Sequence, residues 1–200
     1  MENGLIIPFL DPGKNDIVLD LGCGTGRLAI PIAELSRKVI GIDSSEEMLE
    51  VARCKSKQLK NVEYKRAEIL RRLPFDDASF DKVVAVLVVN HVNDLGKFFM
   101  EVHRVLKSGG AFVFDDAIPD ARYFKQRFGN TLYGMHERGK KVFSIHTVDD
   151  YVNELHRGGF EIEDIKFTRF DERIEPLVTE KTFKANKGRT FGLIVRARKS

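Results

Sequence analysis

The stretch Val18–Leu28 constrains this chain more than any other part of its sequence. The mostly apolar run Val18–Leu21 leads directly into a turn that holds Gly22, Gly24 and Gly26 and then into a predicted helix. The first two glycines permit positive φ and close backbone approach, and the third lets the helix pack tightly on a sheet. This order places a ligand at a helix N-terminus. We therefore predict a pocket for a nucleotide-like cofactor, the alternative being a turn that only connects strand to helix.

Two acidic residues discriminate between the cofactors that such a turn can hold. A dinucleotide fingerprint reads G-x-G-x-x-G, whereas this turn reads G-x-G-x-G, and Asp20 puts a carboxylate beside the position of a pyrophosphate. That charge repels phosphate and suits a ligand with an ammonium or sulfonium group. Asp43 ends the next apolar run, where it is placed to bind a ribose diol. The residues therefore fit S-adenosylmethionine, with a nicotinamide-dependent oxidoreductase as a further alternative.

The composition predicts a single domain, residues 1–200. The chain has 200 residues, 42% of them hydrophobic, which suffices for one full core. It contains no apolar run of about 18 residues and no signal-peptide pattern, so we expect a cytoplasmic protein without a membrane partner. The two cysteines, Cys23 and Cys54, are expected to be free thiols.

Strand and helix patterns alternate between residues 16 and 116, which predicts an α/β fold with a doubly wound, mostly parallel sheet. Strands are expected at 16–21, 38–42, 62–66, 80–88 and 110–115, and helices at 25–36, 45–58 and 94–106. Ser44 and Glu47 have the spacing of a capping box for the second helix. Nearer the C-terminus we expect a helix at 148–157, strands at 160–169 and 190–197, and a polar turn at 182–188.

Residues 117–147 interrupt this alternation and are expected to form a lid-like insertion with one helix at 121–128. Residues 117–200 carry 17 basic and 12 acidic side chains, against 16 and 18 in residues 1–116. Six of the basic side chains lie between residues 121 and 141, interleaved with aromatic ones. The pattern is typical of a solvated amphipathic face, and it also suits an anionic acceptor or RNA.

Four sequence blocks, in this order, resemble the class I S-adenosylmethionine-dependent methyltransferases, in particular the group that methylates small molecules. The blocks are Val18–Ile30, Gly41–Leu49, Leu73–Asp81 and Glu101–Gly110. The resemblance covers residues 16–116 and, more weakly, the last two strands. It implies a Rossmann-like sheet of seven strands whose last strand is antiparallel, and S-adenosyl-L-methionine as the cofactor.

The resemblance also implies roles for residues near the first two strand ends. Asp20 and the backbone from Gly22 to Gly26, which includes Cys23, would hold the methionine part of the cofactor. Asp43 would bind both ribose hydroxyls, and Ser44 beside it belongs to the same expected cofactor set.

Further along the chain the resemblance implies contacts to the adenine and methyl ends. Met48 would pack on adenine, although a methionine here is equally typical of an ordinary core, and Leu87 would line the pocket near the methyl donor. Related enzymes end the third strand with an acidic residue followed by alanine, whereas this chain reads Arg66-Ala67-Glu68. Either Glu68 or the backbone of Ala67 would then contact adenine.

His91 is the candidate catalytic residue, because it follows the strand predicted at 80–88 where the methyl group would emerge. A base is needed only if the nucleophile loses a proton during attack, and a histidine here can also simply cap or pack beside the next helix. No histidine has a metal-ligand spacing, so no metal is expected.

The segment after this strand also bears on the acceptor. Asn90-His91-Val92 differs from the Pro-Pro-aromatic and Pro-Cys motifs that enzymes methylating DNA bases carry there, so DNA is not expected as a partner. The leading prediction is a small-molecule acceptor, which the basic insertion suggests is anionic. The alternatives are an RNA methyltransferase that uses this insertion, and a cofactor-binding interaction subunit without turnover. The sequence specifies neither the oligomeric state nor the methylated atom.

Overall fold

The computed structural model describes residues 3–117, 136–137, 140–141, 146–169, 171–172 and 180–200. The helices are α1 (Asn3–Leu10), α2 (Ala29–Leu35), α3 (Glu46–Lys55), the 3-10 helix η1 (Val89–His91), α4 (Leu95–Val105), α6 (Val148–Arg157) and α7 (Glu180–Asn186). The strands are β1 (Ile17–Leu21), β2 (Lys38–Asp43), β3 (Val62–Arg66), β4 (Phe80–Ala85), β5 (Leu106–Ala117), β6 (His136–Glu137), β7 (Lys140–Lys141), β8 (Phe160–Arg169) and β9 (Thr190–Lys199).

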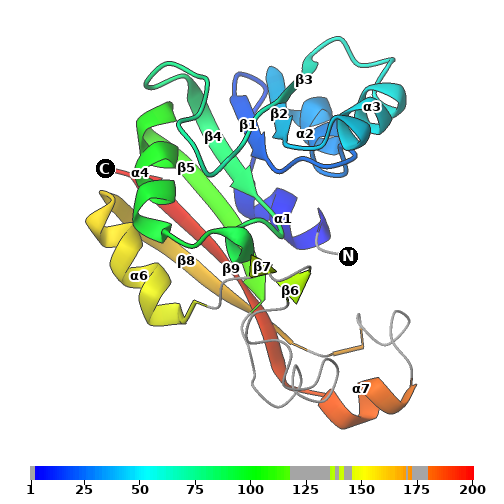
Figure 1. Ribbon diagram of the computed structural model, residues 1–200, viewed down its shortest axis with the longest axis vertical. Helices are drawn as coiled ribbons and strands as arrows, with labels where there is room; N and C mark the ends of the chain where they lie inside the picture. The colour runs from blue at the N-terminus through cyan, green and yellow to red at the C-terminus, as the bar shows by residue number, and fades with distance from the viewer. Residues whose placement is uncertain (1–2, 118–135, 138–139, 142–145, 170, 173–179) are drawn as a thin grey trace.

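Seven of the strands form one sheet with the order β3-β2-β1-β4-β5-β9-β8 (Figure 1). Neighbouring strands from β3 to β5 are parallel, and β9 runs antiparallel to both of its neighbours. The predicted α/β fold, with its antiparallel last strand, is thereby confirmed. Because β1 to β4 are parallel, their carboxyl ends meet at one edge of the sheet, which is where open sheets of this kind bind ligands.

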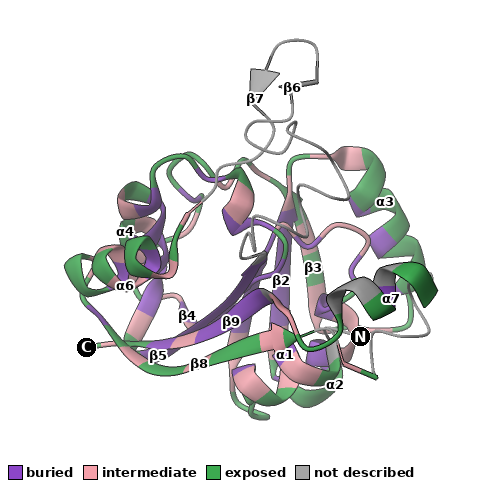
Figure 2. Ribbon diagram, turned by 90° about the horizontal axis from the view of Figure 1, so that it is seen from below, coloured by how far each residue is buried: buried purple, intermediate pink, exposed green. Residues whose placement is uncertain are grey.

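Helices cover both faces of the sheet. α1 and α2 lie against one face, and α4 and α6 lie against the other (Figure 2). On the first face Val18 of β1 packs with Ile32 of α2 in one buried cluster. On the second face the rings of Phe99, Phe112 and Phe114 have centroids 5.2 to 5.9 Å apart. Burial on both faces explains why these strands are apolar runs rather than alternating ones.

One helix and one strand next to the carboxyl edge of the sheet are shorter than the sequence predicts. The helix expected at 25–36 begins only at Ala29, because the residues after the glycine turn continue as turns. The strand expected at 80–88 ends at Ala85, since Leu87 has a φ of 58° and so leaves the extended conformation.

Two local predictions were wrong. The cap of α3 is Ser45 rather than Ser44: its hydroxyl accepts the backbone N–H of Met48 at 3.2 Å, and its own backbone is extended. The turn expected at 182–188 is mostly helix α7, where burial of the Phe183 side chain stabilises the helical conformation. The expected helix at 121–128 and most of the insertion lie outside the described residues, which include the paired strands β6 and β7.

The connection from β3 to β4 is held by the guanidinium of Arg104 on α4. It donates to the carbonyl oxygens of Phe75 at 2.7 Å and Leu73 at 3.0 Å, and to the carboxylates of Asp77 and Glu101. Glu101 in turn accepts the backbone N–H of Leu73 at 2.9 Å. The planar guanidinium of arginine can donate to several acceptors at once, so the Arg104 side chain fixes this connection.

We predict that Arg104→Met lowers the free energy of unfolding by about 2 kcal/mol, because backbone carbonyls and a partly buried carboxylate lose their charged donor. Urea denaturation measures this change. Arg157→Met is the matched control: Arg157 pairs with Glu154 on the surface of α6 with 76% of its side chain exposed, so its loss should change stability by less than about 0.5 kcal/mol. Equal losses in the two variants would contradict the proposed role of Arg104.

Candidate functional site

The register of the parallel strands brings three predicted site segments together. Leu21, the last residue of β1, lies opposite Ile42 on β2 and Ala85 on β4. The glycine turn, Asp43 and the residues after β4 therefore start from the same edge of the sheet. Segments that are separated by more than 60 positions in the sequence thus form one site.

Two positions of the turn require glycine. Gly22 has a φ of 68°, and a β-carbon there would lie 2.4 Å from Cγ2 of Val88. Gly26 has a φ of 77°, and a β-carbon there would lie 2.6 Å from the hydroxyl oxygen of Tyr64. Gly24 also has a positive φ, of 51°, but open space around it. The turn is therefore packed tightly at both ends and open in its middle.

The carboxylate of Asp43 connects this turn to α3. Its Oδ2 accepts the backbone N–H of Gly24 at 2.9 Å, and its Oδ1 accepts the backbone N–H of Ser45 at 2.9 Å. The N–H of Cys23 donates to the carbonyl of Ile42 at 3.0 Å, which ties the turn to β2 a second time. Each carboxylate oxygen has a second lone pair, so Asp43 can still accept hydrogen bonds from a ligand.

A cavity of about 560 Å³ opens at this edge of the sheet. It contains seven of the residues predicted from the sequence, namely Gly22, Asp43, Ser44, Ala67, Glu68, Leu87 and His91. Its other lining residues are Ile69, Leu70 and Val88, which the sequence analysis missed. Each lies three or four residues after the end of β3 or β4, and apolar residues at that distance from a strand end are the signal that could have found them. The volume lies within the range of roughly 300 to 1,000 Å³ that small-ligand sites have.

The remaining predicted cofactor residues lie around this cavity rather than in its lining. Cys23 and Gly26 are buried within the turn, and Gly24 lies at the turn's open middle. Met48, in the first turn of α3, has 47% of its surface exposed, so it is not the core residue that its sequence context also allowed.

Asp20 lies beneath the turn with only 2% of its surface exposed. Burial raises the pKa of its carboxyl from 3.8 to about 7, although Arg27 and a hydrogen bond from the backbone of Ala29 act in the opposite direction. Within the described part of the chain its Oδ2 has no hydrogen-bond partner. Burial, and next the charge of Asp20, also raise the pKa of the Cys23 thiol. Asp20 is therefore only partly ionised near neutral pH, whereas the sequence argument assigned it a full charge.

The end of β3 supplies both alternatives that the sequence left open. The N–H of Ala67 donates to the carbonyl of Asp43 at 3.0 Å, which places the backbone of Ala67 beside Asp43 in the cavity wall. Glu68 forms an ion pair with Arg71 at 2.8 Å and has 60% of its side chain exposed. Arg66 donates to the carbonyl of Ser44 at 3.1 Å, so the residue that departs from the family pattern supports the loop after β2.

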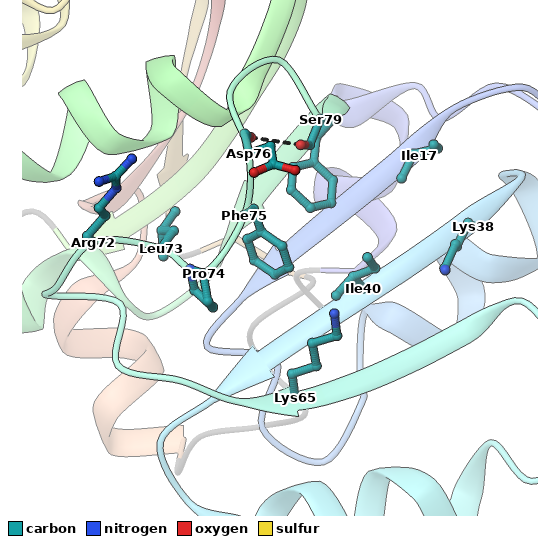
Figure 3. A pocket seen from close by; sticks show the side chains of 11 residues that line it. Ile17, Lys38, Ile40, Lys65, Arg72, Leu73, Pro74, Phe75, Asp76 and Ser79 are labelled. Atoms are coloured by element: carbon teal, nitrogen blue, oxygen red, sulfur yellow. Dashed lines mark hydrogen bonds between the residues drawn. The ribbon is translucent and has the colours of Figure 1, made fainter.

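A second cavity, of about 640 Å³, lies beside the first residues of β1, β2 and β4, which are Ile17, Lys38 and Phe80 (Figure 3). Lys65 of β3 also lines it, and its ammonium lies 5.5 Å from the centre of the Phe75 ring. This cavity shares no lining residue with the cavity at the glycine turn and Asp43, and we assign the candidate site to the latter.

Among the described residues, no group of three or more His, Cys, Asp or Glu side chains is arranged to hold a metal ion. None of the helices described combines the length and apolar character that crossing a membrane requires.

Comparisons with known proteins agree with this geometry. A methyltransferase domain model matches residues 19–114. The demethylmenaquinone methyltransferase of Tropheryma whipplei is 30% identical over 151 residues, which are 75% of this chain and 62% of that protein. A crystal structure of an S-adenosylmethionine-dependent methyltransferase from Mesorhizobium loti superimposes with a TM-score of 0.75, covers 99% of this chain and 96% of its own, and is 25% identical. Residues 19–114 of the chain thus match a methyltransferase domain, and the chain shares the fold of an S-adenosylmethionine-dependent methyltransferase.

A further relative of this chain is the ubiquinone biosynthesis O-methyltransferase of Pelagibacter ubique. It is 39% identical over 102 residues, which are 50% of this chain and 41% of that protein. The chain thus spans less than two thirds of the length of these curated relatives. All residues that line the cavity lie within the part of the chain that the methyltransferase domain model matches.

We predict that Asp43→Ala weakens binding of S-adenosylhomocysteine by about 1 to 3 kcal/mol, because charge-assisted hydrogen bonds to the ribose are lost. Isothermal titration calorimetry measures this change. Asp76→Ala is the matched control, because Asp76 is an exposed carboxylate at the second cavity, and it should leave the dissociation constant unchanged. An unchanged constant for Asp43→Ala would refute the placement of the ribose.

The raised pKa of Asp20 predicts a pH-dependent stability. Between pH 3.8 and about 7 the folded protein binds the Asp20 proton more tightly than the unfolded protein, so the contribution of Asp20 to the free energy of unfolding falls as pH rises. Asp20→Asn mimics the neutral acid. We expect urea denaturation to show wild type losing stability relative to this variant, on the order of a few kcal/mol, from pH 4 to pH 7. A constant difference would contradict the raised pKa.

Proposed function

We propose that this protein transfers a methyl group from S-adenosyl-L-methionine to a small organic acceptor. The observation that carries the proposal is Asp43 at the end of β2, held by the N–H groups of Gly24 and Ser45 in the wall of a cavity that also contains Gly22. A fixed carboxylate beside a glycine turn is suited to a ribose diol. The unpartnered Oδ2 of Asp20 beneath the same turn is suited to a donor group on the amino-acid part of the ligand.

The residues around the cavity divide the work of binding and positioning. When bound, S-adenosylmethionine supplies an electrophilic methyl group on a sulfonium. Asp43 accepts hydrogen bonds from the ribose, and the backbone of Ala67 together with Glu68 contacts the adenine. Leu87 covers the reacting end with an apolar side chain and excludes water from it. These residues orient the reactants, which is the main contribution that a protein makes to a displacement of this kind.

His91 is the proposed general base. It lies in η1, lines the cavity and is exposed, and its backbone N–H donates to the carbonyl of Val88 at 2.9 Å, so its place relative to the turn after β4 is fixed. An exposed imidazole at this point can accept a proton from a hydroxyl or a carbon acid. His103, in contrast, stacks edge-on against Phe160 with centroids 5.3 Å apart and belongs to the packing of α4.

Two relatives suggest the class of acceptor. The proteins from Tropheryma whipplei and Pelagibacter ubique are named for demethylmenaquinone and for ubiquinone biosynthesis. We infer a small, ring-bearing, quinone-type acceptor for this chain. These names support a small molecule over the RNA alternative. The basic residues from which we also infer an acidic group on the acceptor lie largely outside the described residues.

The proposal is tested with radiolabelled methyl transfer from S-adenosylmethionine to a water-soluble demethylnaphthoquinol. We expect turnover by wild type, and a decrease of about 10² to 10⁴ in kcat for His91→Ala with little change in the dissociation constant of S-adenosylhomocysteine. His156→Ala, on the far end of α6, is the control and should retain full activity.

Three outcomes would count against the proposal. If the wild-type protein binds neither S-adenosylmethionine nor S-adenosylhomocysteine, the proposed methyltransferase function is refuted. Binding without turnover on naphthoquinols or RNA would favour an interaction subunit. Transfer to RNA that weakens steeply with salt would favour the RNA alternative.

A further inference from the structure

Leu87 has a backbone conformation that leucine rarely adopts. Its φ is 58°, in the left-handed region where a β-carbon crowds the following carbonyl group. Its side chain is 50% exposed and lines the cavity beside Gly22 and His91. A strained residue of this kind persists only where the surrounding structure holds it in place. The residue that holds Leu87 is therefore part of what shapes the cavity.

That residue is Asp115 on β5. The N–H of Leu87 donates to Oδ1 of Asp115 at 2.7 Å, and Asp115 has only 6% of its surface exposed. A charged acceptor in a buried position makes a stronger hydrogen bond than a neutral one. Asp115 is itself fixed, because β5 pairs with β4 on one side and with β9 on the other. The turn after β4 is thereby anchored to the centre of the sheet.

The same turn supports other parts of the site. Val88 approaches Gly22 so closely that a β-carbon on the glycine would lie 2.4 Å from it. The carbonyl of Val88 also accepts the N–H of His91 at 2.9 Å. A different conformation at Leu87 would therefore displace both the contact with the glycine turn and the backbone that carries His91.

We propose that Asp115 is a positioning residue of the cofactor site, which holds Leu87 in the left-handed conformation and so places the leucine side chain in the cavity wall. The inference rests on the proposed function, since it concerns the same cavity. Glycine adopts such a turn without strain, so a leucine at this position indicates that the side chain itself has a role. That role is to close the apolar wall around the bound cofactor.

Calorimetric titration of the full chain with S-adenosylhomocysteine tests this proposal. Asp115→Ala should raise the dissociation constant about tenfold, because the hydrogen bond that holds the turn is lost. Asp115→Asn keeps an acceptor oxygen and should raise it no more than about threefold. Leu87→Gly should also raise it about tenfold, because the leucine side chain is missing from the cavity wall. Adding Asp115→Ala to Leu87→Gly should change it less than about twofold, because glycine adopts the left-handed conformation without being held and no side chain is left to position.

Two control variants separate positioning from general stability. Tyr151→Phe removes the hydroxyl that donates to the neighbouring Asp116, so it should lower the midpoint of thermal unfolding and leave the dissociation constant unchanged. Ala78→Gly relieves the same kind of strain, at a φ of 52°, away from the cavity and should also leave the constant unchanged. Leu87→Gly should not lower the unfolding midpoint by more than about 2 °C, because relief of strain offsets the lost side chain.

The outcomes are distinguishable. The proposal is overturned if Asp115→Ala has the same dissociation constant as Tyr151→Phe. It is also overturned if the effects of Asp115→Ala and Leu87→Gly on the dissociation constant multiply in the double variant. If Asp115→Ala does not fold, Leu87→Gly becomes the deciding variant. An unchanged dissociation constant of S-adenosylhomocysteine for Leu87→Gly then overturns the proposal. A wild-type chain that binds no S-adenosylhomocysteine would overturn the proposed function as well, whereas normal wild-type binding with unaffected variants overturns this inference alone.

Discussion

The hydrogen bonds between the glycine turn and the end of β2 are the interactions on which the rest of the site depends. Cys23 donates to the carbonyl of Ile42, and Gly24 donates to the carboxylate of Asp43. Both bonds require the parallel register in which Leu21 lies opposite Ile42. A slip of one residue would turn Asp43 to the other face of the sheet and leave the turn without its acceptor. The register of β1 and β2 is thus a structural and a functional constraint at once.

Two unfavourable features lie at this same edge. Leu87 has a positive φ, and Asp20 is a buried carboxyl group whose Oδ2 has no hydrogen-bond partner within the described part of the chain. The apolar clusters on both faces of the sheet fix the strands from which these residues start, and so hold the residues in their unfavourable states. The stability of the packed strands therefore offsets the free-energy cost of the strained residues at this edge.

The match to the methyltransferase domain model stops close to the start of the expected insertion. The methyltransferase domain model ends at residue 114, three residues before the expected insertion begins. The part that it covers supplies the glycine turn, Asp43 and the turn after β4, which are the elements of cofactor binding that we propose. Function is set by sites carried on a fold rather than by the fold itself, so the matched part of the chain indicates the cofactor but not the acceptor.

The sequence by itself determined the alternation of strands and helices, the need for glycine in the turn, and the place of Asp43 at a strand end, since each follows from local conformation and periodicity. Several features were decided only by tertiary structure. The burial that raises the pKa of Asp20 depends on what covers it, and the early end of β4 depends on Asp115, 28 residues further along the chain. Hydrogen bonds and burial between distant segments leave no local pattern, because they exist only once the sheet has brought those segments together.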